Sequence, residues 1–506
     1  MNLREGFLQS AAERAGSPAL VVRGRTYSYG ELDESARRWA AWILERKTAP
    51  AERVGVFGSR SAISYTGALA ALYAGGAFVP LNPRFPVERT AAMVRAADLD
   101  VIIADEQGVA QLSALETAGV NLPPVLRPEA DSLPQPVKDL PELVPERVAY
   151  LLFTSGSTGM PKGVPITNGN VRSYLDWARG RYHVGPSDRC SQTFDQTFDL
   201  SVHDLFVAWD GGACVYAMSP VELLAPAGFI NKHQLTVWFS VPSIPAQMRK
   251  RGTLKPGTLP TLRWSLFCGE PLPQASAEAW QSAAPNSIVE NLYGPTELTI
   301  ACTVHRWDPA SSPEMCVNGM VAIGVPFLGL EAVLLDDNLK QVGADEAGEL
   351  CVTGAQTSPG YWRDPAKTAE RFVDFEGRRY YRTGDRVQRL GCGEFVCLGR
   401  ADYQIKVLGF RVELGEIEAV LQKNSSVVQA VAMGWPVSEG TAQGIVAFVF
   451  GAGLDGEALR ANARAALPDY MTPAKVYVLD SMPLNANGKV DRGALKKWLE
   501  NGELSA

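Results

Sequence analysis

The stretch from Tyr150 to Gly163 combines residue types that could hold a polyphosphate. It begins as an apolar run, typical of a buried strand, and continues as a loop of hydroxyls and glycines that ends in one lysine. The glycines let backbone N–H groups point at an anion, the hydroxyls add donors, and the lysine adds positive charge. The predicted phosphate-binding residues are Thr154, Ser155, Gly156, Ser157, Thr158, Gly159 and Lys162. The alternative is a Gly/Ser surface loop. The kinase-type P-loop is excluded because its Gly-Lys-Ser/Thr ending is absent.

A second motif carries groups suited to a nucleotide and a metal ion. It reads Asn291-Leu292-Tyr293-Gly294-Pro295-Thr296-Glu297. Tyr293 offers a flat face for a purine, and the Gly-Pro pair predicts a tight turn. The oxygens of the last two residues suit Mg²⁺. Taken alone, the motif favours a β-turn with a structural tyrosine.

Asp199 is unusual because its neighbours are mostly apolar. Burying an unpaired carboxylate is costly, so such a residue needs a partner. One possibility is that its side chain caps a helix N-terminus. The other is that it binds a cationic group of a ligand.

The elements around these motifs indicate parallel sheets. A helix with Leu32, Ala36, Trp39 and Ile43 on one face alternates with buried strands and further helices, which favours a parallel sheet under helical cover. Three later apolar runs each end in Gly/Pro loops that carry polar groups; they lie at 235–243, 262–271 and 288–297. Ligands bind beyond the carboxyl ends of strands in such sheets, so we expect these loops to line one crevice.

Length and charge limit the remaining possibilities. A chain of 506 residues is too long for one core, and the elements predicted after residue 402 suit a small α+β domain. The net charge of −7 argues against nucleic acid or an anionic membrane as the main partner. We expect no signal peptide and no transmembrane helix. The eight cysteines form no Cys-x-x-Cys pair, so a cytoplasmic, reducing location is the expectation.

Taken in order, the motifs from about Arg25 to Arg492 resemble the adenylate-forming superfamily. This superfamily includes acyl-CoA synthetases, luciferases and the adenylation domains of nonribosomal peptide synthetases. The resemblance implies an α/β protein with a large N-terminal domain over residues 1–401, built from two helix-covered sheets plus a small β-barrel-like unit. It also implies a small, mobile α+β lid domain over residues 402–506, with its hinge at Asp402 and a lysine loop at 485–492.

The resemblance assigns roles around ATP and Mg²⁺. Tyr293 matches the residue that packs on adenine, and Glu297 matches the magnesium ligand. Asp385, predicted on a turn, matches the ribose-diol contact, and Arg400 matches a second ribose or phosphate contact. Lys489 matches the lysine that reaches the α-phosphate and the substrate carboxylate. Out of context the last three are ordinary solvated charges. The nucleotide set adds Gly269, Glu270, Asn291, Leu292, Gly294, Pro295 and Thr296; the catalytic set is Thr154, Glu297 and Lys489.

The resemblance also suggests an amino-acid substrate. The aspartate of a Phe-Asp-x-Ser motif pairs with the substrate α-ammonium, and Asp199 matches it. The residues matched to the rest of the pocket are Leu200, His203, Phe239, Leu266, Cys268, Leu292, Ile300 and Ala301, with Lys489 at the carboxylate. They are mostly apolar or small, which favours a modest, uncharged amino acid. The D-alanine–carrier protein ligases are similar around Asp199 and at 267–270 but differ at His203, which could bind a polar substituent or be a core histidine.

The predicted function is ATP-dependent formation of an aminoacyl-AMP with release of pyrophosphate, followed by transfer to a thiol. We expect the acceptor to be a separate carrier protein with a phosphopantetheine arm, with coenzyme A as the second choice. One alternative is an acyl-CoA synthetase for a non-amino carboxylic acid. Another is a non-catalytic, adenylation-like binding protein. The sequence does not identify the amino acid.

Overall fold

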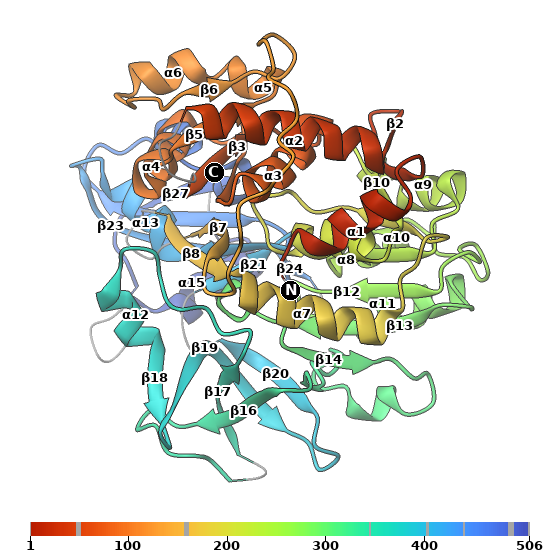
Figure 1. Ribbon diagram of the computed structural model, residues 1–506. Helices are drawn as coiled ribbons and strands as arrows, with labels where there is room; N and C mark the ends of the chain where they lie inside the picture. The colour runs from red at the N-terminus through yellow and green to blue at the C-terminus, as the bar shows by residue number, and fades with distance from the viewer. Residues whose placement is uncertain are drawn as a thin grey trace. The chain divides into compact units, whose positions relative to one another are not determined.

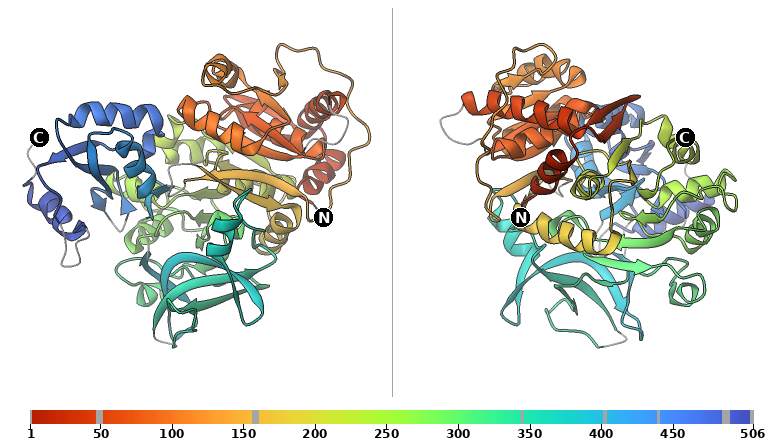
Figure 2. Two further views of the ribbon diagram at one scale, coloured as in Figure 1. Left: turned by 90° about the vertical axis from the view of Figure 1, so that its left-hand side faces the viewer. Right: turned by 45° about the vertical axis from the view of Figure 1, so that its right-hand side comes forward.

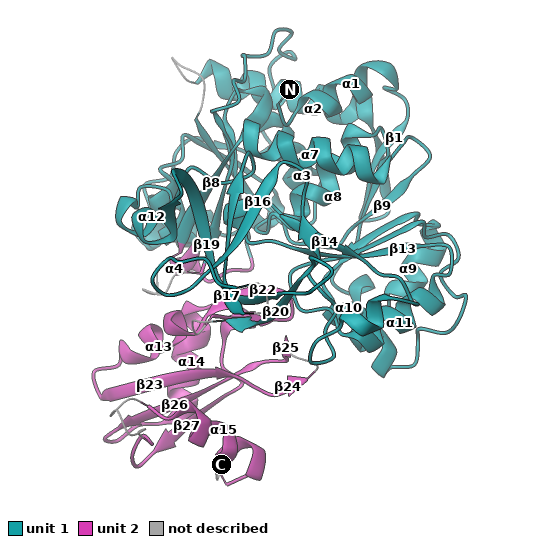
Figure 3. Ribbon diagram, turned by 90° about the horizontal axis from the view of Figure 1, so that it is seen from below, with its two compact units in different colours: residues 1–83, 90–154, 162–401 teal, residues 84–89, 155–161, 402–506 magenta. Residues whose placement is uncertain are grey.

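The computed structural model describes residues 2–46, 52–155, 161–343, 346–400, 404–438, 441–483 and 490–503. The chain divides into two compact units (Figure 3). Unit 1 contains residues 1–83, 90–154 and 162–401, and unit 2 contains residues 84–89, 155–161 and 402–506. The mixed α/β class, with a large N-terminal part and a smaller C-terminal part, agrees with the prediction. The hinge and lid roles assigned to residues 402–506 stay predictions.

The first sheet of unit 1 leads directly into the predicted phosphate loop. Its order is β6-β5-β3-β4-β7-β8, with all pairs parallel except the last. The strands are β3 (Arg53–Phe57), β4 (Ala77–Leu81), β5 (Val101–Ala104), β6 (Val125–Leu126), β7 (Val148–Thr154) and β8 (Lys162–Thr167). Helix α3 (Ala62–Tyr73) packs on β3, β4 and β5. Parallel strands buried on both faces explain the continuous apolar runs in the sequence.

The second sheet gathers the three loop-ending strands that the sequence singled out. Its order is β15-β14-β13-β12-β11-β9-β10-β1-β2, and β13, β12, β11, β9, β10 and β1 run parallel. The strands are β1 (Pro18–Val22), β2 (Arg25–Ser28), β9 (Arg189–Gln192), β10 (Cys214–Ala217), β11 (Val237–Ser240), β12 (Trp264–Phe267), β13 (Ile288–Tyr293), β14 (Thr303–Arg306) and β15 (Val325–Pro326). The carboxyl ends of β11, β12 and β13 therefore share one edge; Figure 1 labels β12 and β13 of this sheet.

A third, antiparallel sheet completes unit 1. Its order is β16-β17-β19-β18, with β20 also paired to β19. The strands are β16 (Leu330–Leu335), β17 (Ala347–Gly354), β18 (Phe372–Phe375), β19 (Arg378–Arg389) and β20 (Phe395–Arg400). Figure 2 shows this sheet, in teal and cyan, as a separate layer of unit 1. It is the small β unit that the sequence predicted.

The helices follow from local sequence signals. Helix α2 begins with a capping box in which Ser28 and Glu31 satisfy each other's backbone N–H groups, and it buries Leu32, Ala36 and Ile43. The other helices of this part are α1 (Glu5–Glu13), α4 (Val87–Ala97), α5 (Glu106–Val109), α6 (Leu112–Thr117), α7 (Asn168–Tyr182), α8 (Leu200–Asp210), α9 (Pro226–His233), α10 (Ser243–Lys250), α11 (Gln274–Ala283) and α12 (Pro365–Arg371), while α2 spans Tyr29–Glu45. The 3₁₀ helices are η1 (Glu222–Leu224), η2 (Thr296–Leu298) and η3 (Ser312–Met315).

Residues 404–503 of unit 2 form two small sheets with three α-helices among the described residues. The sheet orders are β22-β21-β25-β24 and β23-β26-β27. The elements are β21 (Gln404–Val407), β22 (Phe410–Glu413), α13 (Leu414–Gln422), β23 (Val427–Gly434), β24 (Val437–Ser438), β25 (Thr441–Ala442), β26 (Ile445–Gly451), α14 (Gly456–Ala466), η4 (Asp469–Met471), β27 (Lys475–Leu479) and α15 (Arg492–Asn501). In the described chain, no helix has the length and apolarity that a bilayer span needs.

A buried ion pair joins α7 to α8, the helix that follows Asp199. Arg172 donates to both carboxylate oxygens of Asp210 at 2.9 and 3.0 Å, and their side chains are only 5% and 7% exposed. We expect Asp210→Ala to lower the free energy of unfolding by about 3 kcal/mol, because it leaves a buried guanidinium without this partner. Urea denaturation measures the change. A loss no larger than that of a surface Asp→Ala variant, such as Asp337→Ala, would contradict it.

Candidate active site

Glu297 lies at the centre of a buried polar cluster. It follows β13 in the short helix η2, and its side chain is fully buried. Its Oε1 accepts a hydrogen bond from the Tyr361 hydroxyl at 2.7 Å and lies 3.6 Å from Lys162 Nζ. Lys162 Nζ also lies 4.8 Å from the centre of the Tyr361 ring. The structure thus brings the predicted metal ligand next to the predicted phosphate-binding lysine.

Thr154 stands beside that lysine. It is the last residue of β7 and pairs in register with Lys162, the first residue of β8. Its Oγ1 is buried and makes no hydrogen bond with the described residues. A buried hydroxyl without a partner is uncommon in proteins, and a phosphate oxygen would satisfy it. This orphaned donor therefore fits a nucleotide at the strand end.

Six of the predicted site residues lie outside the described part of the chain. Gly156, Ser157, Thr158 and Gly159 lie outside the described residues, as do Asp402 and Lys489. Ser155 belongs to unit 2, where its hydroxyl donates to the Arg411 carbonyl at 3.0 Å.

Asp199 precedes α8 and is 6% exposed. Its side chain makes no capping hydrogen bond to that helix. Its Oδ2 instead accepts the backbone N–H of Ile300 at 3.2 Å. Asp199 therefore occupies the N-cap position of α8, as the helix-cap interpretation expects, but its side chain does not make the capping bond. The ammonium-binding role stays a prediction.

The residues predicted to line the amino-acid pocket lie in one core cluster. Phe239 and Leu266 are register partners on β11 and β12, and Leu292 lies on β13 beside them. Leu200 begins α8, next to Asp199. All of the apolar members are under 9% exposed; they are Leu200, Phe239, Leu266, Cys268, Leu292, Ile300 and Ala301. The neighbouring strand ends thus gather these side chains, while their contact with substrate stays a prediction.

His203 lies on α8, 3% exposed, inside a group of aromatic rings. The Tyr174 hydroxyl lies 2.7 Å from its Nδ1, and the Phe239 ring centre lies 4.5 Å from the imidazole centre. Burial lowers the pKa of His203 to about 3, so the imidazole is neutral near pH 7. One of its two nitrogens is thus used inside the protein, as the core-histidine interpretation expects. Tyr174 was missed by the sequence reasoning, because it comes from a helix 29 residues away.

A second polar cluster joins Tyr293, Asp385 and Arg400. The Tyr293 hydroxyl donates to Asp385 Oδ2 at 2.5 Å, and Arg400 donates to Oδ1 at 2.9 Å. Asp385 was predicted on a turn, and this is wrong: it lies inside strand β19, directly opposite Arg400 on β20. Gly384, which sequence reasoning took as a turn signal, has φ +76° and lies where the register of β19 against β17 shifts, so it marks a β-bulge inside the strand. The carboxylate is therefore held by the sheet.

Two glycines of the predicted nucleotide set are required by the backbone. Gly269 has φ +96°, a conformation that favours glycine. A Cβ on Gly294 would lie 2.5 Å from the Ala301 Cα, so a side chain there would displace the backbone of the following turn. Pro295 and Thr296 continue from Gly294 into η2.

Glu270 and Asn291 each bond the backbone. Glu270 Oε2 accepts the Ser243 N–H at 2.8 Å, and Asn291 Nδ2 donates to the Ala322 carbonyl at 2.9 Å. Asn291 Oδ1 is buried without a hydrogen-bond partner among the described residues, which leaves an acceptor that suits an amino group.

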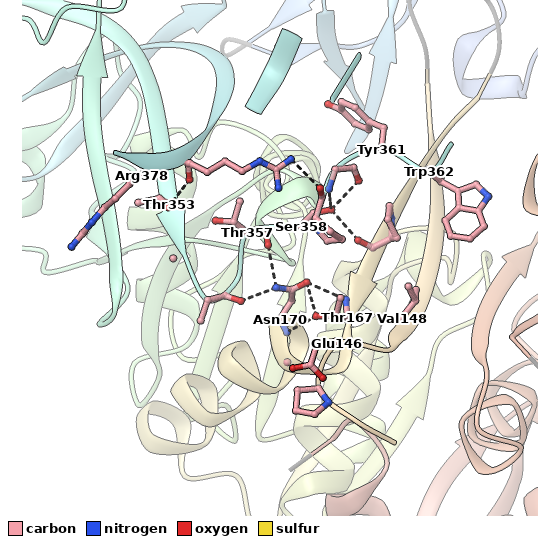
Figure 4. Close-up of a pocket in the computed structure, with 18 of the residues that line it drawn as sticks. Glu146, Val148, Thr167, Asn170, Thr353, Thr357, Ser358, Tyr361, Trp362 and Arg378 are labelled. Carbon is pink, nitrogen blue, oxygen red and sulfur yellow. Dashed lines mark hydrogen bonds between the residues drawn. The ribbon is translucent and has the colours of Figure 1, made fainter. Parts of the chain in front are cut away.

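A pocket of about 920 Å³ lies elsewhere in unit 1 (Figure 4). Asn170, Thr357, Trp362 and Arg378 are among its lining residues, and none of the predicted site residues that the structure describes is. Tyr361 lines this pocket and also bonds Glu297. This pocket therefore borders the Glu297 cluster through Tyr361 without containing the predicted site residues that the structure describes.

The buried state of His203 gives a pH prediction. Folded His203 stays neutral down to about pH 3, whereas an unfolded histidine binds a proton near pH 6.5. The unfolded state therefore binds more protons between these values, and the free energy of unfolding contributed by this group rises with pH across that window. We expect His203→Gln to flatten the slope by up to about 1.4 kcal/mol per pH unit. Urea denaturation between pH 4 and 7 tests this, with Tyr174→Phe as the control that keeps the slope. An unchanged slope in His203→Gln would contradict it.

Comparison with known proteins places this geometry in a family. The family described as "AMP-binding enzyme" matches residues 7–362, and "AMP-binding enzyme C-terminal domain" matches residues 416–489. The L-proline–[L-prolyl-carrier protein] ligase of Streptomyces coelicolor is 34% identical, covering 95% of this chain and 94% of that protein. The probable non-canonical nonribosomal peptide synthetase CymA of Salinispora arenicola is 36% identical over 97% of this chain. The chain spans only 6% of that synthetase.

A solved structure has nearly the same fold. The Vibrio cholerae adenylation domain AlmE, in complex with glycyl-adenosine-5′-phosphate, superposes with a TM-score of 0.90. It is 32% identical, and the match covers 99% of this chain and 98% of that one. Together with the family matches over most of its length, this shows that the chain belongs to the AMP-binding enzymes, the adenylate-forming family.

Proposed function

We propose that this chain activates an amino acid as its aminoacyl-AMP and then transfers the aminoacyl group to the phosphopantetheine thiol of a separate carrier protein. The observation that carries the proposal is Asp199, a buried carboxylate beside the predicted pocket residues that does not cap its helix. An α-ammonium placed beside a buried carboxylate offsets the cost of removing both charges from water. Enzymes that activate plain carboxylic acids have no such use for it.

The first half-reaction joins two anions. The substrate carboxylate attacks the α-phosphorus of ATP, the bond to the β-phosphate oxygen breaks, and pyrophosphate leaves. Positioning and charge stabilisation supply most of the catalysis, since little covalent help is needed. We assign the phosphate contacts to Lys162 and the Thr154 hydroxyl, which are register neighbours. Lys489, outside the described residues, is assigned to the α-phosphate and the substrate carboxylate on the resemblance alone.

Glu297 is proposed as the magnesium ligand. Its carboxylate is buried 3.6 Å from Lys162 Nζ, the predicted phosphate-binding cation. Bound Mg²⁺ would neutralise the phosphate charge that repels the incoming carboxylate. Tyr361 would orient the Glu297 carboxylate through its 2.7 Å hydrogen bond.

The nucleoside end is proposed at Tyr293 and Asp385. Tyr293 is assigned to adenine and Asp385 to the ribose diol, with Arg400 beside it. Both oxygens of Asp385 already accept hydrogen bonds from Tyr293 and Arg400. The ribose hydroxyls would therefore share this carboxylate with Arg400 or take the place of the tyrosine hydroxyl.

Two relatives support the substrate and acceptor. The solved adenylation domain AlmE contains glycyl-adenosine-5′-phosphate, an aminoacyl nucleotide. The Streptomyces coelicolor relative, matched over almost its whole length, is a ligase of L-proline to a carrier protein. We propose the same two classes of reactant here, without assigning the amino acid.

Amino-acid-dependent ATP–pyrophosphate exchange, run over L- and D-amino acids, tests the proposal. For the amino acid that responds, we expect Asp199→Asn to lower kcat/KM by roughly 30- to 5,000-fold, because losing one partner of a buried charge pair costs about 2–5 kcal/mol. Asp204→Asn is the matched control. Asp204 is a buried carboxylate on α8, the helix that follows Asp199, and its Oδ2 accepts the Thr193 N–H at 2.9 Å, a bond that an amide oxygen can keep.

Silence on every amino acid would contradict the amino-acid assignment. A CoA thioester formed from a plain carboxylic acid, with no effect of Asp199→Asn, would favour an acyl-CoA synthetase instead.

The metal assignment is tested at Glu297. We expect Glu297→Gln to lower the exchange rate on the order of 10²–10³-fold at fixed Mg²⁺, because a fixed charge that organises the phosphates is lost. Added Mg²⁺ should recover part of the rate. Tyr361→Phe keeps the carboxylate and should show a smaller defect. An unchanged Mg²⁺ dependence in Glu297→Gln would overturn the assignment.

A further inference from the structure

A strained turn connects the two buried carboxylates of the site. Thr299 and Ile300 have φ of 59° and 73°, and both are β-branched, a residue type that rarely adopts this conformation. The turn follows η2, which carries Glu297, and its Ile300 N–H bonds Asp199. The conformation of two residues therefore fixes the distance between the proposed metal ligand and the proposed amine-binding group.

One side chain holds this turn. Gln356 is 1% exposed, and its Nε2 donates to the carbonyls of Ala301 at 2.7 Å, Leu298 at 3.1 Å and Thr299 at 3.3 Å. The backbone carbonyl of Gln356 in turn accepts the Thr299 hydroxyl at 2.6 Å. An amide nitrogen is a pure donor, so three converging carbonyls define which end of the side chain faces them.

The neighbours of Gln356 hold the other end of the turn. The Ser358 N–H donates to the Glu297 carbonyl at 2.9 Å, and the Tyr361 hydroxyl donates to the Glu297 carboxylate. Ser358 is itself fixed by its hydroxyl, which donates to the Pro165 carbonyl at 2.9 Å. Figure 4 draws Thr357, Ser358 and Tyr361 among the residues that line the pocket. Gln356 is not among the pocket-lining residues, and its side chain is turned to the Leu298–Ala301 turn instead.

We propose that Gln356 is a positioning residue for amino-acid recognition: it holds the Thr299–Ile300 turn so that the Ile300 N–H fixes the Asp199 carboxylate. This inference rests on the proposed function. The proposal gives different roles to neighbouring residues. Gln356 positions the backbone that binds Asp199, the proposed amine-binding residue. Ser358 and Tyr361 instead bond Glu297, the proposed metal ligand.

The test is Gln356→Met, which keeps length and burial but removes the donor. We expect the KM for the amino acid to rise roughly 10- to 100-fold, as the loss of buried hydrogen bonds predicts. The KM for ATP and its Mg²⁺ dependence should stay near wild type, because Glu297 keeps its own bonds. Thr299→Val removes the 2.6 Å bond from the turn to the Gln356 backbone carbonyl and leaves the bonds of the Gln356 amide, so it should shift the amino-acid KM in the same direction by less.

Asn168→Leu is the matched control for stability. The Asn168 side chain is also a fully buried amide that bonds two backbone groups, those of Leu3 and Arg147, and it touches no proposed site residue by these bonds. If Gln356 had a purely structural role, Gln356→Met and Asn168→Leu would both lower the melting temperature, and the KM for the amino acid would be unchanged in each of them. That result overturns the inference, as does an equal rise in the KM of both substrates. If Gln356→Met does not fold, the same criteria apply to Thr299→Val. Wild-type protein without exchange activity on any amino acid would instead overturn the proposed function.

Discussion

The site depends on two buried carboxylates, those of Glu297 and Asp199, which are linked through Ile300: this residue lies three positions after Glu297 and donates its N–H to Asp199. Glu297 is fully buried in η2, and the Ile300 N–H that follows it bonds Asp199 from a different element. Isolated buried charges are costly, so each carboxylate is acceptable only with organised donors around it. Tyr361 and Lys162 lie beside the Glu297 carboxylate, and the strained backbone turn donates the Ile300 N–H to the Asp199 carboxylate. In the proposed reaction, the Glu297 carboxylate would bind Mg²⁺ and the Asp199 carboxylate would bind the substrate ammonium.

The fold brings these donors together from distant parts of the sequence. The strand ends of two parallel sheets deliver Thr154, Lys162 and the β13–η2 segment, while the antiparallel sheet delivers Asp385 and Arg400. Strand pairing is rigid, which suits a reaction that relies on positioning. The strain at Thr299 and Ile300 is held by surrounding bonds, as is typical of functional turns.

Sequence reasoning predicted much of this because the motifs are local. Each motif that predicted a binding site is recognisable within a few residues of sequence. These motifs are the Tyr293–Glu297 run, Lys162 after the glycine-rich loop, and Asp199 among apolar neighbours. The helix–strand alternation was sufficient for the fold class. The family resemblance supplied the order in which the motifs belong together.

What the sequence did not reveal lies in long-range contacts. Gln356, Tyr361 and Tyr174 reach their partners from 55, 64 and 29 residues away, and no local pattern marks them. Asp385 was misplaced because Gly384 resembles a turn signal, whereas the glycine sits inside a long strand. The left-handed Thr299–Ile300 turn opposes the propensity of β-branched residues, so only tertiary bonds could specify it.

The most direct measurement is a crystal structure with Mg²⁺ and a non-hydrolysable aminoacyl-adenylate analogue. The account predicts the ligand ammonium within about 3 Å of an Asp199 carboxylate oxygen, with the adenylate phosphate near Lys162 and Thr154. A ligand bound instead in the 920 Å³ pocket beside Asn170 and Arg378, or an ammonium remote from Asp199, would contradict it.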